Sequence, residues 1–249
     1  MKGTLFVEEH PLPGAANMAR DYTLLRKARE GVLSLRLYSW RPACLSFGRN
    51  EPALARYDRS QLESDRVDVV RRPTGGRAVW HEHEVTYAVA APDSTFGTMR
   101  ETYILIHEML SAALQRLGAH TTVSLDGSRT NLDDGPCFAS PVGGEVVCDR
   151  GKLVGSAQVR EEGCFLQHGS ILVKNGQGVV ERYTTRSVAA QQAVGLEDLL
   201  GRSTSFHEVT AAITAEVSQA WEFDWSADHC CDWPDSDIDF ADPVWTWRR

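Results

Sequence analysis

Segments that read as strands outnumber those that read as helices in this chain, and the two kinds do not alternate. Apolar residues recur at helical spacing in three places, 17–28, 100–117 and 206–221. The predicted strands are 34–40, 43–48, 67–70, 78–91, 145–148, 153–160 and 165–174. A doubly wound parallel sheet needs a helix between successive strands, so this order argues against that architecture. It predicts an α+β fold, with a mixed, mostly antiparallel β-sheet flanked by helices.

Composition narrows the class of protein. The 249 residues are 42% hydrophobic and 24% charged, as in an ordinary globular protein. No apolar run approaches the ~18 residues of a membrane span, and the first ten residues lack the long apolar stretch of an export signal. The formal net charge of −8 argues against binding nucleic acid through bulk positive charge. We therefore expect a cytoplasmic protein with no nucleic-acid and no membrane partner.

The negative charge is concentrated towards the end of the chain. Residues 224–249 contain seven Asp and four Trp but only two Arg, so this segment carries −5 and the rest of the chain −3. We expect one catalytic domain over residues 1–223. It would be followed by a loosely structured, acidic C-terminal tail over 224–249, which could dock through its tryptophans.

Common cofactor and metal motifs are not found in the sequence. Gly151-Lys152 is followed by Leu153, where a phosphate-binding P-loop has Ser or Thr, and Gly176-Gln177-Gly178 lacks the third glycine of a dinucleotide site. The six cysteines form no C-x-x-C pair, and His81 and His83 have no third ligand at metal spacing. We therefore expect no metal and no bound cofactor.

One candidate for chemistry is the arginine-rich turn Arg71-Arg72-Pro73-Thr74-Gly75-Gly76-Arg77-Ala78-Val79. Paired glycines after a predicted strand allow a ligand or another backbone to come close, and three arginines can bind an anion. A plain hairpin turn with solvated arginines fits the same local pattern about equally well.

The other candidate starts at Cys137-Phe138 and continues through Gly151-Lys152 and Gly155-Ser156-Ala157-Gln158 to Gln167-His168-Gly169-Ser170. Three small residues in a predicted strand leave room for a ligand. A loop cysteine can be a nucleophile and a lysine can stabilise developing negative charge. The plainer alternatives are that Cys137 is a small hydrophobe and that Lys152 is solvated.

Together these two segments resemble the two signatures of the biotin/lipoate protein ligase and lipoyl transferase superfamily. The resemblance covers about residues 17–173. Within the superfamily it is closest to the LipM-type octanoyltransferases, which carry Cys-Phe before the Gly-Lys signature and Gly-Gly-Arg before Glu-x-Thr-Tyr. The matching residues are Asn17-Met18-Ala19, 45–49, 71–79, His81, Glu84, Thr86-Tyr87, Cys137-Phe138, 151–158 and 167–170.

This resemblance implies a biotin/lipoate ligase-like catalytic domain that moves octanoate from octanoyl-acyl carrier protein to a lysine of a lipoyl-domain protein, such as a glycine-cleavage H protein. Cys137 would carry the acyl group as a thioester, so no ATP is needed, and Lys152 would lower the pKa of the thiol or bind the oxyanion. His81 and His168 would assist proton transfer or orient the acyl carbonyl. The expected substrate-binding residues are Arg71, Arg72, Thr74, Gly75, Gly76, Arg77, Ala78, His81, Gly155, Ser156, Ala157, Gln158, His168 and Gly169.

Two alternatives stay open at this stage. An ATP-dependent lipoate-protein ligase would use Lys152 on an acyl-adenylate, and Cys137 would be incidental. A non-catalytic acyl- or cofactor-binding module, such as one half of a split ligase, would form no covalent intermediate.

Under the transferase interpretation both protein partners are acidic, and we expect a basic rim around the site to receive them. The residues of this predicted rim are Arg66, Arg71, Arg72, Arg77, Arg150, Lys152 and Arg160.

Overall fold

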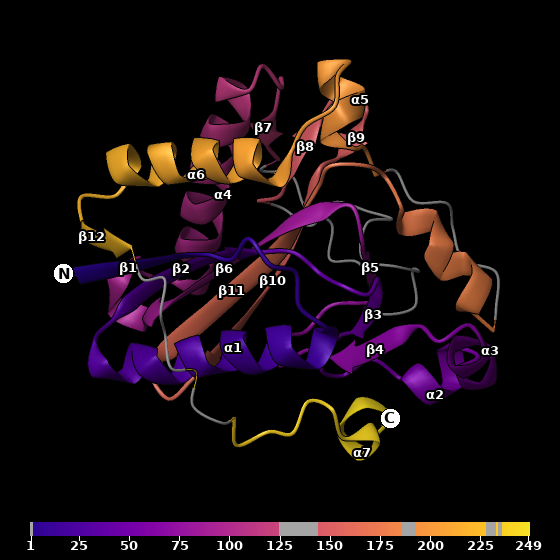
Figure 1. Cartoon of the computed structure of the whole chain (residues 1–249). Coiled ribbons are helices and arrows are strands. Elements are labelled where there is room, and N and C mark those ends of the chain that lie inside the picture. The colour runs from indigo at the N-terminus through magenta and orange to yellow at the C-terminus, as the bar shows by residue number, and fades with distance from the viewer. Residues whose placement is uncertain (1, 125–143, 186–192, 228–232, 234–235) are drawn as a thin grey trace.

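A six-stranded mixed sheet forms the centre of the protein (Figure 1). The computed structural model describes residues 2–124, 144–185, 193–227, 233 and 236–249. The strand order is β10-β11-β6-β2-β1-β12, antiparallel from β10 to β2 and parallel from β2 to β12. The strands are β1 (Lys2–Val7), β2 (Leu33–Tyr38), β6 (Glu84–Pro92), β10 (Val154–Glu161), β11 (Cys164–Leu172) and β12 (Asp224–Ala227). The predicted α+β fold with a mostly antiparallel sheet is confirmed.

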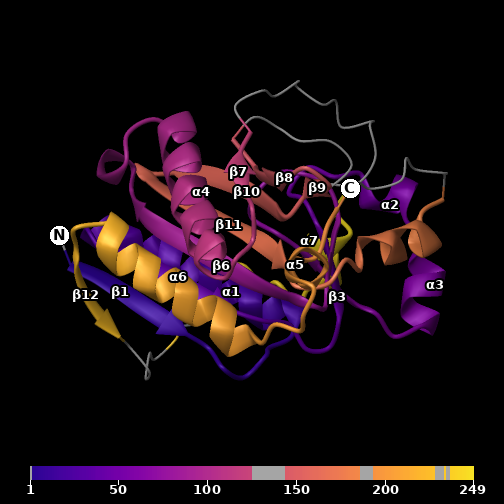
Figure 2. The ribbon, with the colours of Figure 1, turned by 90° about the horizontal axis from the view of Figure 1, so that it is seen from above.

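Helices cover both faces of this sheet. The long helices α4 (Met99–Arg116) and α6 (Phe206–Ala220) lie on one face, and α1 (Gly14–Lys27) lies on the other (Figures 1 and 2). Successive strand residues point to opposite faces. Leu35 of β2 therefore packs with α4 and α6, while Tyr38 of the same strand packs with α1. The helices predicted at 17–28, 100–117 and 206–221 are confirmed to within a few residues.

Two small sheets lie beside the main one. The first has the order β4-β3-β5 and carries the arginine-rich turn between β4 and β5, and the second has the order β7-β8-β9. Their strands are β3 (Cys44–Phe47), β4 (Asp68–Arg71), β5 (Val79–His81), β7 (Thr122–Val123), β8 (Val146–Cys148) and β9 (Gly151–Lys152). The short helices are α2 (Ala53–Arg56), α3 (Arg59–Ser64), α5 (Leu196–Leu200) and α7 (Pro243–Thr246), with 3-10 turns η1 (Ala28–Glu30), η2 (Asp93–Thr95) and η3 (Gln177–Tyr183).

The acidic C-terminal segment is built into the domain where the structure describes it. Its first residues form β12, which pairs in parallel with β1. The sequence periodicity did not predict β12. Further on, Trp245 Nε1 donates to the carbonyl of Arg71 over 2.9 Å, and Trp247 packs edge-on against Phe47. The expectation of docking through tryptophans is therefore confirmed for these two. The expectation of a loosely structured tail is wrong for β12 and α7, because each packs against the domain. The boundary at residue 223 stays a prediction.

Candidate active site

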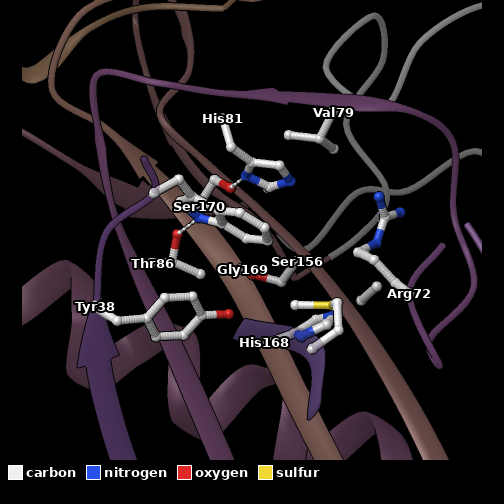
Figure 3. A pocket seen from close by; sticks show the side chains of 13 residues that line it. Tyr38, Arg72, Val79, His81, Thr86, Ser156, His168, Gly169 and Ser170 are labelled. Carbon is white, nitrogen blue, oxygen red and sulfur yellow. Dashed lines mark hydrogen bonds between the residues drawn. The ribbon is translucent and has the colours of Figure 1, made fainter. Parts of the chain in front are cut away.

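A narrow cavity, partly open to solvent, lies between α1 and the α1-facing side of β6, β10 and β11, and its lining side chains are drawn in Figure 3. Met18, Trp40 and Val79 supply apolar surface, and Gly155 leaves its position on the strand beneath without a side chain. The full lining is Met18, Tyr38, Trp40, Arg72, Val79, His81, Thr86, Gly155, Ser156, Ala157, His168, Gly169 and Ser170.

One polar network under the cavity is centred on Asp21, which is fully buried on α1. Its carboxylate accepts hydrogen bonds from Arg36 Nη1 (2.7 Å), Tyr38 Oη (2.7 Å) and His168 Nδ1 (2.8 Å). Burial by itself would raise the pKa of Asp21, but the His168 hydrogen bond and the Arg36 charge outweigh it and lower the pKa. Burial lowers the pKa of His168, whose Nε2 contacts Thr74 Oγ1 at 2.7 Å. Asp21 thus fixes the His168 ring at the cavity wall.

A second polar network is centred on Glu84 at the start of β6. Its Oε1 accepts from Thr86 Oγ1 (2.6 Å) and Ser170 Oγ (2.8 Å), and it lies 2.7 Å from Nδ1 of His81. Trp40 stacks on His81 with ring centroids 4.0 Å apart and donates from Nε1 to Thr86 over 2.7 Å. These bonds hold the His81 ring between a carboxylate and an indole face. A metal ion is not needed to orient it.

The arginine-rich turn is held by its own arginines. Arg72 donates to the carbonyls of Ser46 (2.9 Å), Gly75 (3.1 Å) and Arg77 (2.9 Å), which closes the turn on β3. Fully buried Arg71 donates to the Gly48 carbonyl over 2.7 Å and to other carbonyls. These guanidinium groups satisfy backbone acceptors that would otherwise be buried unpaired. The turn is therefore rigid framework for the site, and Arg72 is the arginine that reaches the cavity.

The predicted close approach of two backbones occurs at this turn, and it requires glycine at two positions. A Cβ on Gly48, at the end of β3, would lie 1.8 Å from the carbonyl oxygen of Gly76. Gly76 itself has φ +90°, a region that favours glycine. Neither Gly75 nor Gly76 lines the cavity, and their predicted contact with substrate stays a prediction.

The second predicted segment supplies the cavity floor. Ser156 of β10 pairs with Gly169 of β11, and a Cβ on Gly169 would lie 2.3 Å from Ser156 Oγ. The missing side chain therefore leaves room for the serine hydroxyl. Gln158 lies farther along β10 and bonds to Gln167 Oε1 over 3.0 Å, away from the lining. The predicted role of Gly155, Ser156 and Ala157 as cavity wall agrees with this geometry.

Lys152 precedes the floor strand and is almost fully buried. Its ammonium lies 2.6 Å from the carboxylate of equally buried Glu145, across the β8–β9 hairpin. The alternative of a solvated lysine is therefore wrong. The Glu145 carboxylate also offsets part of the positive potential that Lys152 alone would supply. Cys137 and Phe138 fall outside the described residues.

The structure divides the predicted substrate-binding residues into two groups. Those that line the cavity are Arg72, His81, Gly155, Ser156, Ala157, His168 and Gly169. Those that do not line it are Arg71, Thr74, Gly75, Gly76, Arg77, Ala78 and Gln158. Among the second group, Thr74 supports His168 and Arg71 supports the turn. All fourteen stay predictions as ligand contacts.

Several site residues were missed at the sequence level because they lie on other elements. Asp21 lies on α1, and Trp40 follows β2. Nothing in the local sequence around either residue pointed to a site. His107 lies on α4 behind the floor strand, with its Nε2 2.7 Å from Ser156 Oγ. Its place on the buried face of a strongly amphipathic helix was the available signal.

The predicted basic rim is wrong for its central members. At most 6% of the surface is exposed in each of four of them: Arg71, Arg72, Arg77 and Lys152. Arg71 and Arg72 donate hydrogen bonds to backbone carbonyls, and Lys152 is paired with Glu145. Their charges cannot be presented to a docking partner. Arg66 and Arg150 are exposed, and Arg160 is partly exposed beside Asp93.

The fold is that of the lipoate protein ligases. A T. acidophilum protein solved with bound lipoic acid superposes with a TM-score of 0.80 at 20% identity over 100% of both chains. A structure of lipoate-protein ligase A bound with ATP superposes with a TM-score of 0.77 at 20% identity, over 94% of this chain and 91% of the other. At these identities the likeness shows the fold.

The chain belongs to the lipoyl protein ligase A/B catalytic domain family, which matches residues 13–218. An octanoyltransferase LipM of Exiguobacterium sp. is 32% identical over 94% of each chain. An octanoyltransferase LipM of Kyrpidia tusciae is 37% identical over 83% of this chain and 82% of the other. The predictions of this superfamily and of an acyltransferase enzyme are confirmed. No helix among the described residues is long and apolar enough to cross a membrane.

Proposed function

We propose that this protein transfers octanoate from octanoyl-acyl carrier protein to a lysine of a lipoyl-domain protein, through a thioester on Cys137. The observation that carries the proposal is the way the cavity's polar groups are bonded. His81, Thr86 and Ser170 bond to Glu84, while Tyr38 and His168 bond to Asp21.

Because these groups already have protein partners, an alkyl chain can fill the cavity without leaving them unpaired. Burying the six methylenes of an octanoyl chain contributes about 5 kcal/mol at most, at ~0.8 kcal/mol each. The cavity therefore favours an acyl chain, in keeping with relatives that are octanoyltransferases.

The chemistry takes two acyl transfers. The Cys137 thiolate attacks the donor thioester, the carrier thiol leaves, and the new thioester has nearly the same free energy, so no ATP or other cofactor is required. The amine of the acceptor lysine then attacks that thioester, the carbon–sulfur bond breaks with its electron pair on sulfur, and a stable amide forms as the proton lost by the amine restores the Cys137 thiol. Lys152, held by Glu145, is proposed to stabilise the oxyanion of each tetrahedral intermediate.

The acceptor is proposed to be a lipoyl domain such as a glycine-cleavage H protein, and the reaction is placed in the cytoplasm. An archaeal bipartite lipoate protein ligase, solved with its E2 lipoyl domain, shares the fold at a TM-score of 0.77 and 19% identity over 99% of this chain and 96% of the other.

Intact-mass measurement after mixing the protein with octanoyl-acyl carrier protein, without ATP, tests the proposal. We expect an octanoyl adduct that disappears in Cys137→Ser and persists in Cys148→Ser, a half-buried cysteine outside the cavity lining. Absence of an adduct, combined with activity that requires ATP, would instead make the protein a lipoate-protein ligase. Absence of both would leave the non-catalytic binding module.

A further inference from the structure

The C-terminal segment reaches back to the arginine-rich turn, although the family match ends at residue 218. Helix α7 lies beside β4, the strand that leads into the turn (Figure 1). Trp245 Nε1 donates to the carbonyl of Arg71 over 2.9 Å, and Nε of Arg71 donates to the carbonyl of Thr246 over 2.9 Å. The backbone and the side chain of Arg71 are therefore both fixed by α7.

The residues that follow α7 add contacts to the neighbouring strand β3. Trp247 packs edge-on against Phe47, with ring centroids 5.2 Å apart. Arg248 donates from Nη2 to the carbonyl of Arg49 over 3.0 Å. Phe47 is the last residue of β3 and Arg71 is the last residue of β4. The C-terminal segment therefore ties the ends of these two strands together at the edge of the turn.

The turn carries this restraint to the cavity. Arg72 lines the cavity and closes the turn through its bonds to backbone carbonyls. Thr74 contacts Nε2 of His168, another lining residue, at 2.7 Å. Val79, at the end of the turn, adds apolar surface. The turn is thus one wall of a cavity whose other walls come mostly from α1 and the main sheet.

We propose that Trp245 is a positioning residue for substrate binding, which through Arg71 holds the arginine-rich turn as a closed wall against the acyl chain. This inference rests on the proposed function, because it takes the cavity to bind the octanoyl chain. Trp245 does not line the described cavity, so it acts on how tightly the chain is bound and not on the bonds that form and break. Loss of its bond lets the turn open more often, which weakens donor binding and the discrimination between chain lengths.

Helix α7 is suited to act locally on the turn. It has four residues, and a helix this short owes its stability to packing against its surroundings. Val244 is 75% exposed and Thr246 only 3%, so α7 docks through the side that faces β4. One bond lost on that side therefore loosens α7 and the turn, whereas the main sheet is held by its own strand pairing.

Trp245→Phe is the test variant, because phenylalanine keeps a ring beside Phe240 and Arg248 but has no N–H to donate. Steady-state kinetics with octanoyl-acyl carrier protein should show KM raised about fivefold, the effect of one lost hydrogen bond. The kcat should stay within about twofold of wild type, since the lost interaction supports binding alone. The preference for octanoyl over decanoyl donors should fall as well.

Trp225→Phe is the matched control. Trp225 lies on β12, at the opposite edge of the main sheet from β10. Its Nε1 has no hydrogen-bond partner among the residues that the structure describes. The same substitution there changes packing without removing a bond to the turn, so KM and the chain-length preference should keep their wild-type values.

Hydrogen exchange adds a measurement that needs no activity. In Trp245→Phe the amides of residues 71–79 should exchange about fivefold faster than in wild type, because the turn opens more often. The amides of β10 and β11 should exchange at the wild-type rate. A general loss of stability would instead raise exchange in all of these segments.

Each outcome decides the inference. A KM within about twofold of wild type in Trp245→Phe would overturn it, as would a lower kcat with KM unchanged. Faster exchange throughout the chain would assign Trp245 to general stability and overturn it as well. If Trp245→Phe does not fold, Arg248→Ala, which removes the bond to Arg49, decides in its place. No transfer by the wild type would be a failure of the proposed function, and hydrogen exchange would still show whether α7 holds the turn.

Discussion

The neutrality of His107 gives a pH dependence of stability that can be worked out from its surroundings. Burial holds the pKa of this histidine at about 4, below the 6.5 of an accessible imidazole. Between pH 4 and pH 6.5, His107 binds a proton in the unfolded chain but not in the folded protein. The stability that neutral His107 contributes is therefore complete above pH 6.5 and is lost as the pH falls towards 4.

The magnitude follows from the two pKa values. A difference of about 2.5 units corresponds to about 3 kcal/mol at 1.36 kcal/mol per unit, and about 2 kcal/mol of this is lost between pH 7 and 4.5. His107→Asn removes the titrating group. The variant should be less stable than wild type at pH 7, since it loses the bond to Gly144. The difference in the free energy of unfolding between the two proteins should narrow by about 2 kcal/mol at pH 4.5.

Urea unfolding, followed by tryptophan fluorescence at both pH values, measures this change. His207→Asn serves as the control, because His207 lies exposed on α6, and its difference from wild type should stay constant with pH. The m-values must agree between variants for the comparison to hold. If the free energy of unfolding of His107→Asn differs from that of wild type by the same amount at pH 7 and pH 4.5, the reasoning is refuted.

Three further predictions concern the framework of the site. Asp21→Asn should cost about 3–5 kcal/mol in the free energy of unfolding, because it removes a carboxylate paired with fully buried Arg36; a loss below about 1 kcal/mol would contradict this. Gly48→Ala should abolish folding or lower Tm strongly, since its Cβ would lie 1.8 Å from the Gly76 carbonyl, and wild-type circular dichroism and Tm would disprove the contact. Met18→Ala should open the fully buried end of the cavity lining and raise kcat/KM for decanoyl relative to octanoyl donors; an unchanged ratio would exclude Met18 as a determinant of chain length.

Local patterns in the sequence were sufficient for most of the elements. Helices such as α4 and α6 have an apolar face that any packed fold must bury, and a strand such as β2 alternates apolar and polar residues. The patterns failed at one edge of the main sheet, where β1 and β12 lie. β12 owes its strand structure to pairing with β1, although more than two hundred residues separate them.

The candidate site divides in the same way. The sequence by itself identified the two signature segments through their resemblance to a known family, and with them Arg72, His81, His168 and the small residues of β10. Only the tertiary structure decided that Arg71 is a buried clamp, that Asp21 orients His168 from a helix 147 residues away, and that His107 stands behind Ser156. The physical reason is that the burial and the hydrogen-bond partners of a residue depend on how distant elements pack together. The same residue type is therefore a solvated charge in one place and part of a fixed polar network in another.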